Sequence, residues 1–173
     1  LKASTARGDW PKAHRNTLAW LTEVRVEDSG LATVEEVRLD EALDLEGARE
    51  LATLRLGYDP ATQTAEIQRV RVIGREGVVR IIDPRAAVDA PAFQHMIYWG
   101  MRTKLLEIPG VRVGDAVETT VVRKGFQIAY LRQGAGDEDR FVPPMRGHYY
   151  DVVTFGDAVP IAERRYQVSL PPG

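Results

Sequence analysis

The 173 residues carry 23 Lys and Arg against 25 Asp and Glu, which gives a formal net charge of −2 with neutral histidines. This near-balance provides no basic field for nucleic acid or an anionic membrane surface, so we expect neither as a partner. Hydrophobic residues make up 44% of the chain, enough for a buried core. The absence of Cys excludes disulfides, thiolate metal sites and a Cys nucleophile within this sequence. No apolar run approaches the roughly 20 residues that span a bilayer, so we expect no membrane insertion.

The two ends of the sequence differ from its middle. Residues 1–16 are polar without periodicity, and we expect a flexible lead-in there. Residues 17–170 are expected to form a single β-sandwich-like domain, and residues 171–173 the start of a linker. The chain begins with Leu1 rather than Met, and these ends together predict a fragment of a larger protein.

A β-hairpin is predicted at the start of the domain. Apolar and polar residues alternate over residues 17–26, and again around Val37 and Leu39, with the two-residue period of half-buried strands. Between these runs, residues 27–30 (Glu-Asp-Ser-Gly) have turn chemistry, because Gly30 adopts positive φ without steric cost.

Residues 44–52 are the only good helix candidate. Leu45, Ala48 and Leu51 fall on one helical face, and Asp44 precedes them as an N-cap. Gly47 inside this segment lowers its intrinsic helix propensity.

Three more strands are predicted after the helix, at residues 53–58, 64–73 and 78–82. The apolar positions of the second strand change from odd to even numbers near Gln68, which predicts one extra residue and therefore a β-bulge. The following segment, residues 83–91, contains two prolines and is predicted to be a loop.

The second half of the chain reads as further strands. A strand is predicted at residues 97–105 with its odd-numbered side chains facing the core, so that Trp99 points inward and Tyr98 outward. The Pro109-Gly110 and Gly114-Asp115 pairs frame a turn.

The remaining elements are two hairpins and a loop. Strands at residues 117–122 and 126–131 are predicted to join at Lys124-Gly125. Residues 133–140 form an acidic, glycine-containing surface loop, and a last hairpin spans residues 148–170 around Gly156-Asp157. About ten strands and one helix near residues 44–52 predict an all-β fold, either an antiparallel β-sandwich or two packed sheets.

The sequence contains no arrangement typical of catalysis or metal binding. The serines lack a Gly-x-Ser-x-Gly context, the histidines lack metal-ligand spacing, and the adjacent acids at residues 137–139 do not alternate as calcium ligands do. These residues are Ser4, Ser29, Ser169, His14, His95 and His148. We therefore expect no catalytic residue, no cofactor and no metal site, although two converging carboxylates of a hydrolase stay open as an alternative.

Tyr98 and Tyr149 are the candidate surface-contact residues. Each belongs to an adjacent aromatic pair on a predicted strand, so that one ring of each pair faces outward. Exposed tyrosines build sugar-stacking or protein-binding surfaces, and the alternative is that they are single rings packed beside arginine side chains.

Several segments together resemble a known family. They are residues 46–60, which end in Tyr-Asp-Pro, residues 67–73, residues 77–79, and residues 106–118, which contain a Pro-Gly-x-x-x-Gly-Asp turn. This order, over about residues 17–170, resembles the bacterial domain of unknown function found immediately before transglutaminase-like catalytic cores. The Thr119-Thr120-Val121 run and the acidic loop depart from the family pattern.

The resemblance implies a non-catalytic accessory domain of an exported, periplasmic or otherwise extracytoplasmic bacterial protein. Its partner is expected to be a neighbouring core in the same chain with a Cys-His-Asp triad, or a protein or peptide substrate of that core. No catalytic residue is carried over, because this sequence has no Cys. The alternative is a stand-alone carbohydrate- or peptide-binding β-sandwich module.

Overall fold

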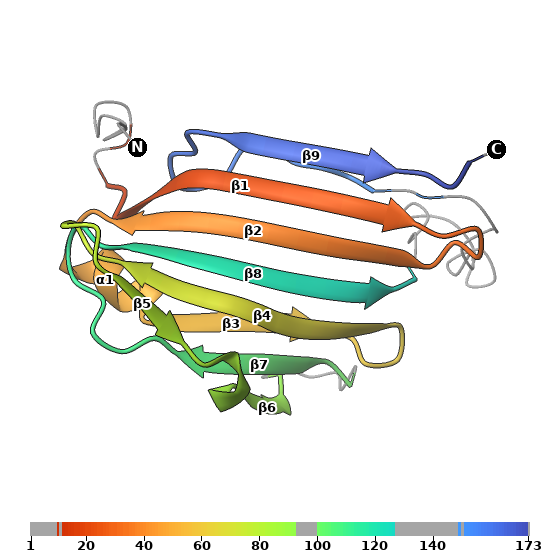
Figure 1. Ribbon diagram of the computed structural model, residues 1–173, viewed down its shortest axis with the longest axis horizontal. Coiled ribbons are helices and arrows are strands. Elements are labelled where there is room, and N and C mark those ends of the chain that lie inside the picture. The colour runs from red at the N-terminus through yellow and green to blue at the C-terminus, as the bar shows by residue number, and fades with distance from the viewer. Residues whose placement is uncertain (1–9, 11, 93–99, 127–148, 150, 173) are drawn as a thin grey trace.

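The structure is a computed structural model that describes residues 10, 12–92, 100–126, 149 and 151–172. Their strands form two sheets (Figure 1). Sheet A has six strands in the order β5-β4-β8-β2-β1-β9, and sheet B has three in the order β3-β7-β6. The elements are β1 (Arg15–Val26), β2 (Ala32–Ala42), α1 (Leu45–Leu51), β3 (Thr53–Tyr58), β4 (Gln63–Ile73), β5 (Val79–Ile82), η2 (Pro84–Ala86), β6 (Val88–Pro91), β7 (Arg102–Glu107), β8 (Ala116–Gly125) and β9 (Arg164–Ser169). The predicted β-rich fold of two sheets with one short α-helix is confirmed.

The turn at Gly30 and the β-bulge in β4 are present as the sequence predicts. Gly30 has φ 83° and donates its N–H to the carbonyl of Glu27, which closes the β1–β2 hairpin. In β4 the pairing with β8 shifts between Ile67 and Arg69, so Gln68 is the extra residue of the predicted bulge. Both features depend on local sequence, and both predictions are confirmed.

Helix α1 contains a glycine because another segment of backbone passes beside it. The Asp44 side chain caps the helix by accepting from the Gly47 N–H at 3.0 Å. A Cβ on Gly47 would lie 1.8 Å from the carbonyl oxygen of His14. The same oxygen accepts from the Leu43 N–H, so the entry to β1 and the start of α1 are fixed against each other.

The main core lies between sheet B and one half of sheet A. Its fully buried side chains come from β3, β4, β7 and β8 and from the segment after β7, and they include Leu56, Val70, Val72, Leu106 and Ile108. A second, smaller cluster of Val24, Val26 and Ala32 belongs to the β1–β2 end of sheet A. Sheet B therefore leaves the inner face of β1 and β2 outside the main core.

The structure corrects two predictions in the middle of the chain. Residues 83–91, predicted as a loop, contain η2 and the strand β6. On β7 the fully buried residue is Leu106, which pairs with Leu54, so even-numbered rather than odd-numbered side chains face the core. Pairing decided both outcomes: β6 pairs with β7, and β7 pairs with β3, which is about 50 residues away in the sequence.

Two predicted hairpins are also wrong. Lys124 and Gly125 do not form a turn but continue β8, where Gly125 pairs with Ala32 on one side and Gln63 on the other. The described residues around Gly156 form no hairpin, and β9 pairs with β1 in parallel.

Several predictions fall partly or wholly outside the described residues. They concern most of the lead-in at residues 1–16, Tyr98 and Trp99, the strand at residues 127–131 and the acidic loop at residues 133–140. At the end of the lead-in, β1 begins at Arg15 and Ala13 is buried. None of the helices in the described part of the chain is long and apolar enough to cross a membrane.

We expect Gly47→Ala to lower the free energy of unfolding by about 3 kcal/mol or more, because the new methyl group overlaps the His14 carbonyl rather than a flexible side chain. Urea denaturation followed by circular dichroism measures this loss. Gly156→Ala is the matched control: its Cβ meets nothing within 4 Å, and its effect should stay within about 0.5 kcal/mol. Equal stabilities of the two variants would contradict the close approach at α1.

Candidate functional site

A charged groove lies on the inner face of sheet A beside sheet B. Its volume is about 300 Å³. One wall is formed by β3 and the end of α1, and the opposite wall by the inner faces of β2 and β8. The charged residues that line it are Arg15, Glu36, Arg38, Asp40, Glu50, Arg55 and Arg123. We call this feature the inner groove.

Strand register explains why charged side chains lie on an inner face. In β2, Asp40 pairs with the buried Val117 of β8, and Glu36 pairs with the buried Val121. Paired residues point to the same side of a sheet, so the even-numbered polar residues of β2 face inward. The wall formed by β2 is therefore polar, whereas the wall formed by β8 is continuous with the apolar core.

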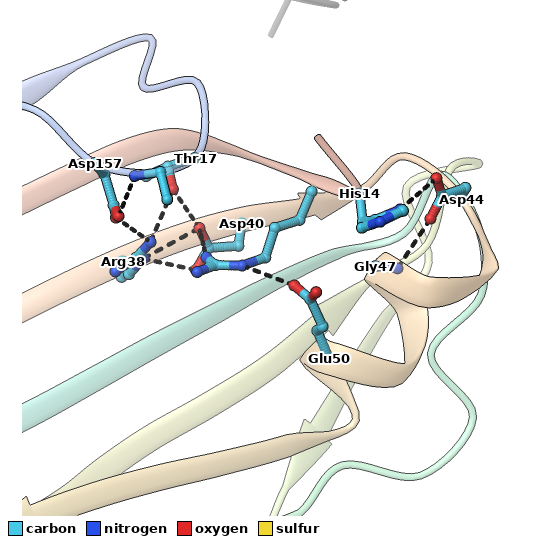
Figure 2. A network of polar contacts seen from close by, with 10 residues as sticks. His14, Thr17, Arg38, Asp40, Asp44, Gly47, Glu50 and Asp157 are labelled. Carbon is cyan, nitrogen blue, oxygen red and sulfur yellow. Dashed lines mark hydrogen bonds and ion pairs between the residues drawn. The ribbon is translucent and has the colours of Figure 1, made fainter. Parts of the chain in front are cut away.

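Asp40 is the centre of the polar network on this face (Figure 2). Only 7% of this residue is exposed. Its carboxylate accepts from Arg15 Nη1 at 3.2 Å and Thr17 Oγ1 at 2.5 Å, and it pairs with Arg38 Nε at 2.8 Å. Arg38 also donates to Thr17 at 3.0 Å and to Asp157 at 3.4 Å. The network joins β1, β2 and the segment before β9.

The network extends to the helix through a second carboxylate. Arg15 Nε donates to Glu50 Oε2 of α1 at 3.2 Å while its Nη1 contacts Asp40. One guanidinium thus bridges β2 and α1 across the end of the inner groove. Two charge-assisted hydrogen bonds from one guanidinium hold the wall of the groove in place.

Trp20 supports the network from below. Its indole ring lies between two guanidiniums, with Arg38 4.4 Å and Arg164 3.7 Å from the ring centroid. A cation close to the face of an indole is attracted by the negative potential of the ring. Arg164 also lies 5.6 Å from the Phe155 ring, so β9 and the segment before it are attached to β1 by the same contact.

Arg55 and Arg123 differ from the arginines of the network. Neither makes an ion pair or hydrogen bond with any described residue, and the same is true of Glu36. Arg55 is exposed on β3, and Arg123 is half-buried on β8. The inner groove therefore combines a fixed ionic wall with two guanidiniums that are available to a ligand.

His14 forms a separate ion pair at the end of the groove wall. Its Nδ1 lies 3.0 Å from Asp44 Oδ2 (Figure 2). The hydrogen bond to Asp44, and then the charge of that carboxylate, raise the pKa of His14 above its usual range. The same Asp44 caps α1, so the protonation of His14 acts on the start of the helix.

The serines and histidines of the sequence analysis lie in separate segments where the structure describes them. Ser29 lies in the β1–β2 turn, where its Oγ accepts from Leu31 N at 3.2 Å, and Ser169 ends β9. No group of three metal-ligating side chains occurs within the described ranges. Ser4, His95 and His148 lie outside those ranges.

The groove does contain three carboxylates, which bears on the hydrolase alternative. Asp40 and Glu50 are held by guanidiniums, which is the arrangement of a structural ion pair. Glu36 is the remaining carboxylate and has no such partner among the described residues.

Tyr149, one of the two candidate contact residues, is half-buried against the Val24 cluster. Its hydroxyl lies 2.7 Å from that of Tyr166, and both phenols contact Asp151. Burial, followed by the Asp151 hydrogen bond, raises the pKa of Tyr166. Tyr98 lies outside the described residues, so the contact surface predicted for this pair remains a prediction.

Sequence reasoning missed the arginines of the inner groove. Arg15, Arg38, Arg55 and Arg123 are spread over four segments and share no motif. The one available signal was the polar run Glu36, Arg38, Asp40 on one side of a predicted strand, which reads equally well as a solvent face.

The chain belongs to the family described as "Domain of Unknown Function with solved-structure structure (DUF3857)", whose sequence profile matches residues 28–173. No curated protein matches the chain. This match confirms one part of the resemblance, namely that the chain is a domain of unknown function.

Two solved structures are similar to this chain. One, from Parabacteroides distasonis, is described as a "putative protease"; the TM-score is 0.57 and the identity 11%, over 68% of this chain and 24% of that chain. This likeness concerns the fold alone, and this chain spans about a quarter of that protein. The other is the CBM3a-L domain of the cellulosome scaffoldin of Clostridium thermocellum, with a TM-score of 0.40 and 8% identity over 82% of this chain and 79% of that chain.

Removing the Asp40 carboxylate should leave two partly buried guanidiniums without their shared acceptor. We expect Asp40→Ala to lower the free energy of unfolding by about 2–3 kcal/mol. Asp157→Ala is the matched control: its contact with Arg38 is long at 3.4 Å, its other side-chain contact is a local bond from the adjacent Ala158 N–H, and its side chain is 28% exposed; its cost should stay below about 1 kcal/mol. Chemical denaturation distinguishes the two, and a larger loss for Asp157→Ala would show that Asp40 is not the centre of the network.

The raised pKa of His14 predicts the direction of a pH effect. A group whose pKa is higher in the folded state contributes stability that is fully present below its ordinary pKa and is lost as pH rises through the folded pKa. Stability should therefore fall as pH rises above the ordinary value of 6.5. An NMR titration measures the pKa of His14, and Asp44→Asn, which retains an N-cap side chain, should return it towards that value. A pKa that Asp44→Asn leaves unchanged would contradict the assignment.

Proposed function

We propose that this member of the DUF3857 family is a non-catalytic accessory domain that binds a polypeptide in its inner groove. The observation that carries the proposal is the pair of arginines, Arg55 and Arg123, that line the groove without a partner among the described residues. A guanidinium free of internal ion pairs keeps its donors for a ligand carboxylate.

The groove is suited to a polypeptide because of its composition. Apolar side chains such as Leu54 and Leu56 share it with charged ones, and the ionic network at Asp40 holds its wall. A binding site of this size uses a few placed polar groups for orientation and apolar area for affinity. The described residues supply both without a nucleophile and base in contact.

We further propose that the domain acts beside a transglutaminase-like core of the same protein and presents that core's protein substrate to it. Two points support this: the resemblance of residues 46–60 and 106–118 to the domain that precedes such cores, and the fold's occurrence as 24% of a larger protein described as a "putative protease". The same resemblance supports a periplasmic or otherwise extracytoplasmic location. A reading frame without a Cys-His-Asp domain beside this one would contradict the pairing with a core.

Binding is tested with fluorescently labelled, dephosphorylated β-casein, an extended acidic polypeptide. We expect fluorescence anisotropy to show binding with a dissociation constant in the range of about 10–100 μM, weakening as salt rises. Arg55→Glu/Arg123→Glu should weaken it by about tenfold or more while thermal unfolding stays unchanged, because neither side chain has an internal partner to lose.

Arg75→Glu/Arg112→Glu is the matched control for charge. Both of these arginines are exposed and lie outside the inner groove, in the turns after β4 and before β8. This variant should bind casein as the unaltered chain does. Equal loss in both double variants would indicate a nonspecific charge effect, and cleavage of casein by the isolated chain would contradict the non-catalytic role.

A further inference from the structure

The strand β3 presents an unpaired edge to the inner groove. Sheet B ends at β3, which pairs with β7 on one side, and no described residue pairs with its other side. The consecutive residues 53–56 all line the groove. A strand seen from one face contributes alternate residues, whereas a strand seen from its edge contributes consecutive ones. The edge of β3 therefore faces the groove, and alternate backbone N–H and C=O groups point into it.

Among the described strands, none lies next to β3 on this side of sheet B. Sheet B has three strands where sheet A has six, and in Figure 1 the wide sheet extends through β2, β1 and β9 beyond the region that β3 overlies. A strand added next to β3 would lie in the groove, whose opposite side is formed by β8 and β2. The polar side chains on the inner face of β2, Glu36, Arg38 and Asp40, are of a kind that contacts a hydrated ligand rather than a permanent core.

The edge itself lacks most features that prevent strand pairing. Natural edge strands are protected by proline, bulges or several charged side chains. The sequence of β3, Thr-Leu-Arg-Leu-Gly-Tyr, has no proline, its register with β7 is continuous, and Arg55 is its only charge. Gly57 has nothing within 4 Å of the position of a Cβ, so the chain leaves space there for an approaching backbone.

The charges of the groove select the partner. Arg15 and Arg38 are already paired with Asp40, whereas Arg55 and Arg123 have no partner among the described residues. Glu36 is the carboxylate of the groove lining that is likewise without a partner there. Side chains of an added strand alternate between the groove floor and solvent. Acidic residues of the added strand near Arg55 and Arg123 would form ion pairs with these guanidiniums, whereas basic residues would be repelled.

We propose that an extended acidic peptide segment of another protein binds by strand addition to the free edge of β3, with backbone hydrogen bonds to β3 and carboxylates on Arg55 and Arg123. This mode rests on the proposed polypeptide-binding function and specifies how the ligand is held. Main-chain pairing would give affinity for extended chains of varied sequence, and the two arginines would give the preference for acidic ones.

The test uses a synthetic acetylated octapeptide in which two Glu and two Val alternate in pairs, so that both faces of the extended strand carry Glu, and two versions of it N-methylated on one or the other set of alternate amides. In an added strand only one set of amides faces β3. We expect one N-methylated version to lose affinity by about 30-fold or more and the other to bind like the parent, measured by calorimetry. Amides of β3 that point to the free edge should gain protection in hydrogen exchange when the parent peptide binds.

Charge is tested on the same peptides. Arg55→Glu/Arg123→Glu should weaken binding of the Glu peptide and strengthen binding of a peptide with Lys in place of each Glu. Arg75→Glu/Arg112→Glu should leave the binding of both peptides unchanged. The double variant keeps the β3 edge, so the hydrogen-exchange pattern with the Lys peptide should match that of the parent complex. This keeps the backbone and charge contributions separate.

The outcomes distinguish strand addition to β3 from polypeptide binding in general, the proposed function on which it rests. Casein and peptide binding with equal affinity for both N-methylated versions, or without protection in β3, would overturn strand addition and leave polypeptide binding in place. Absence of binding by casein and all peptides would overturn both. A dimer seen by sedimentation, together with hydrogen-exchange protection of β3 in the absence of peptide, would identify a second copy of the chain as the occupant. That result would also overturn the proposal.

Discussion

The difference in width between the two sheets is the constraint on which the rest of the structure depends. Three strands in sheet B bury the inner side of β4 and β8, and the largest apolar cluster is confined to that half. Beyond β3, the part of the chain that the structure describes adds no further strand of sheet B over β2 and β1. A strand in that position needs side chains that tolerate water on the inside of the fold, and Glu36, Arg38 and Asp40 meet this need.

A buried carboxylate on such a face is stable only when its oxygens are used. Asp40 receives donors from Arg15, Thr17 and Arg38, and these residues come from β1 and β2. Because Arg15 also contacts Glu50 and Arg38 also contacts Asp157, the same charges tie α1 and the segment before β9 to the sheet. Ionic contacts thus hold together the half of sheet A that the main core does not reach, and they give the groove one rigid wall.

The sequence predicted what short segments decide and missed what distant pairing decides. The Gly30 turn, the Asp44 cap and the bulge at Gln68 follow from a few adjacent residues, and the structure has all three. Gly125 has the composition of a turn, but pairing on both sides keeps it in β8. The parallel addition of β9 to β1 joins residues about 140 positions apart, for which no local pattern exists. The groove combines residues from β1, β2, α1, β3, β8 and the segment after β7, and it was therefore not predictable from spacing.

The alternation of apolar and polar residues in β2 correctly predicts a strand but not which of its faces points into the fold. Val37 and Leu39 alternate with Arg38 and Asp40, and one-sided burial would place the apolar pair inside. The pairing of Asp40 with Val117 places the charged pair inside instead, while Val37 lies opposite Leu21 on the outer face. Desolvating charged residues is costly, so such an inversion persists only where partners or a ligand compensate it. Partners compensate Asp40 and Arg38, whereas Arg55 and Arg123 beside them have none in the described chain, and that contrast separates the supporting wall of the groove from its binding groups.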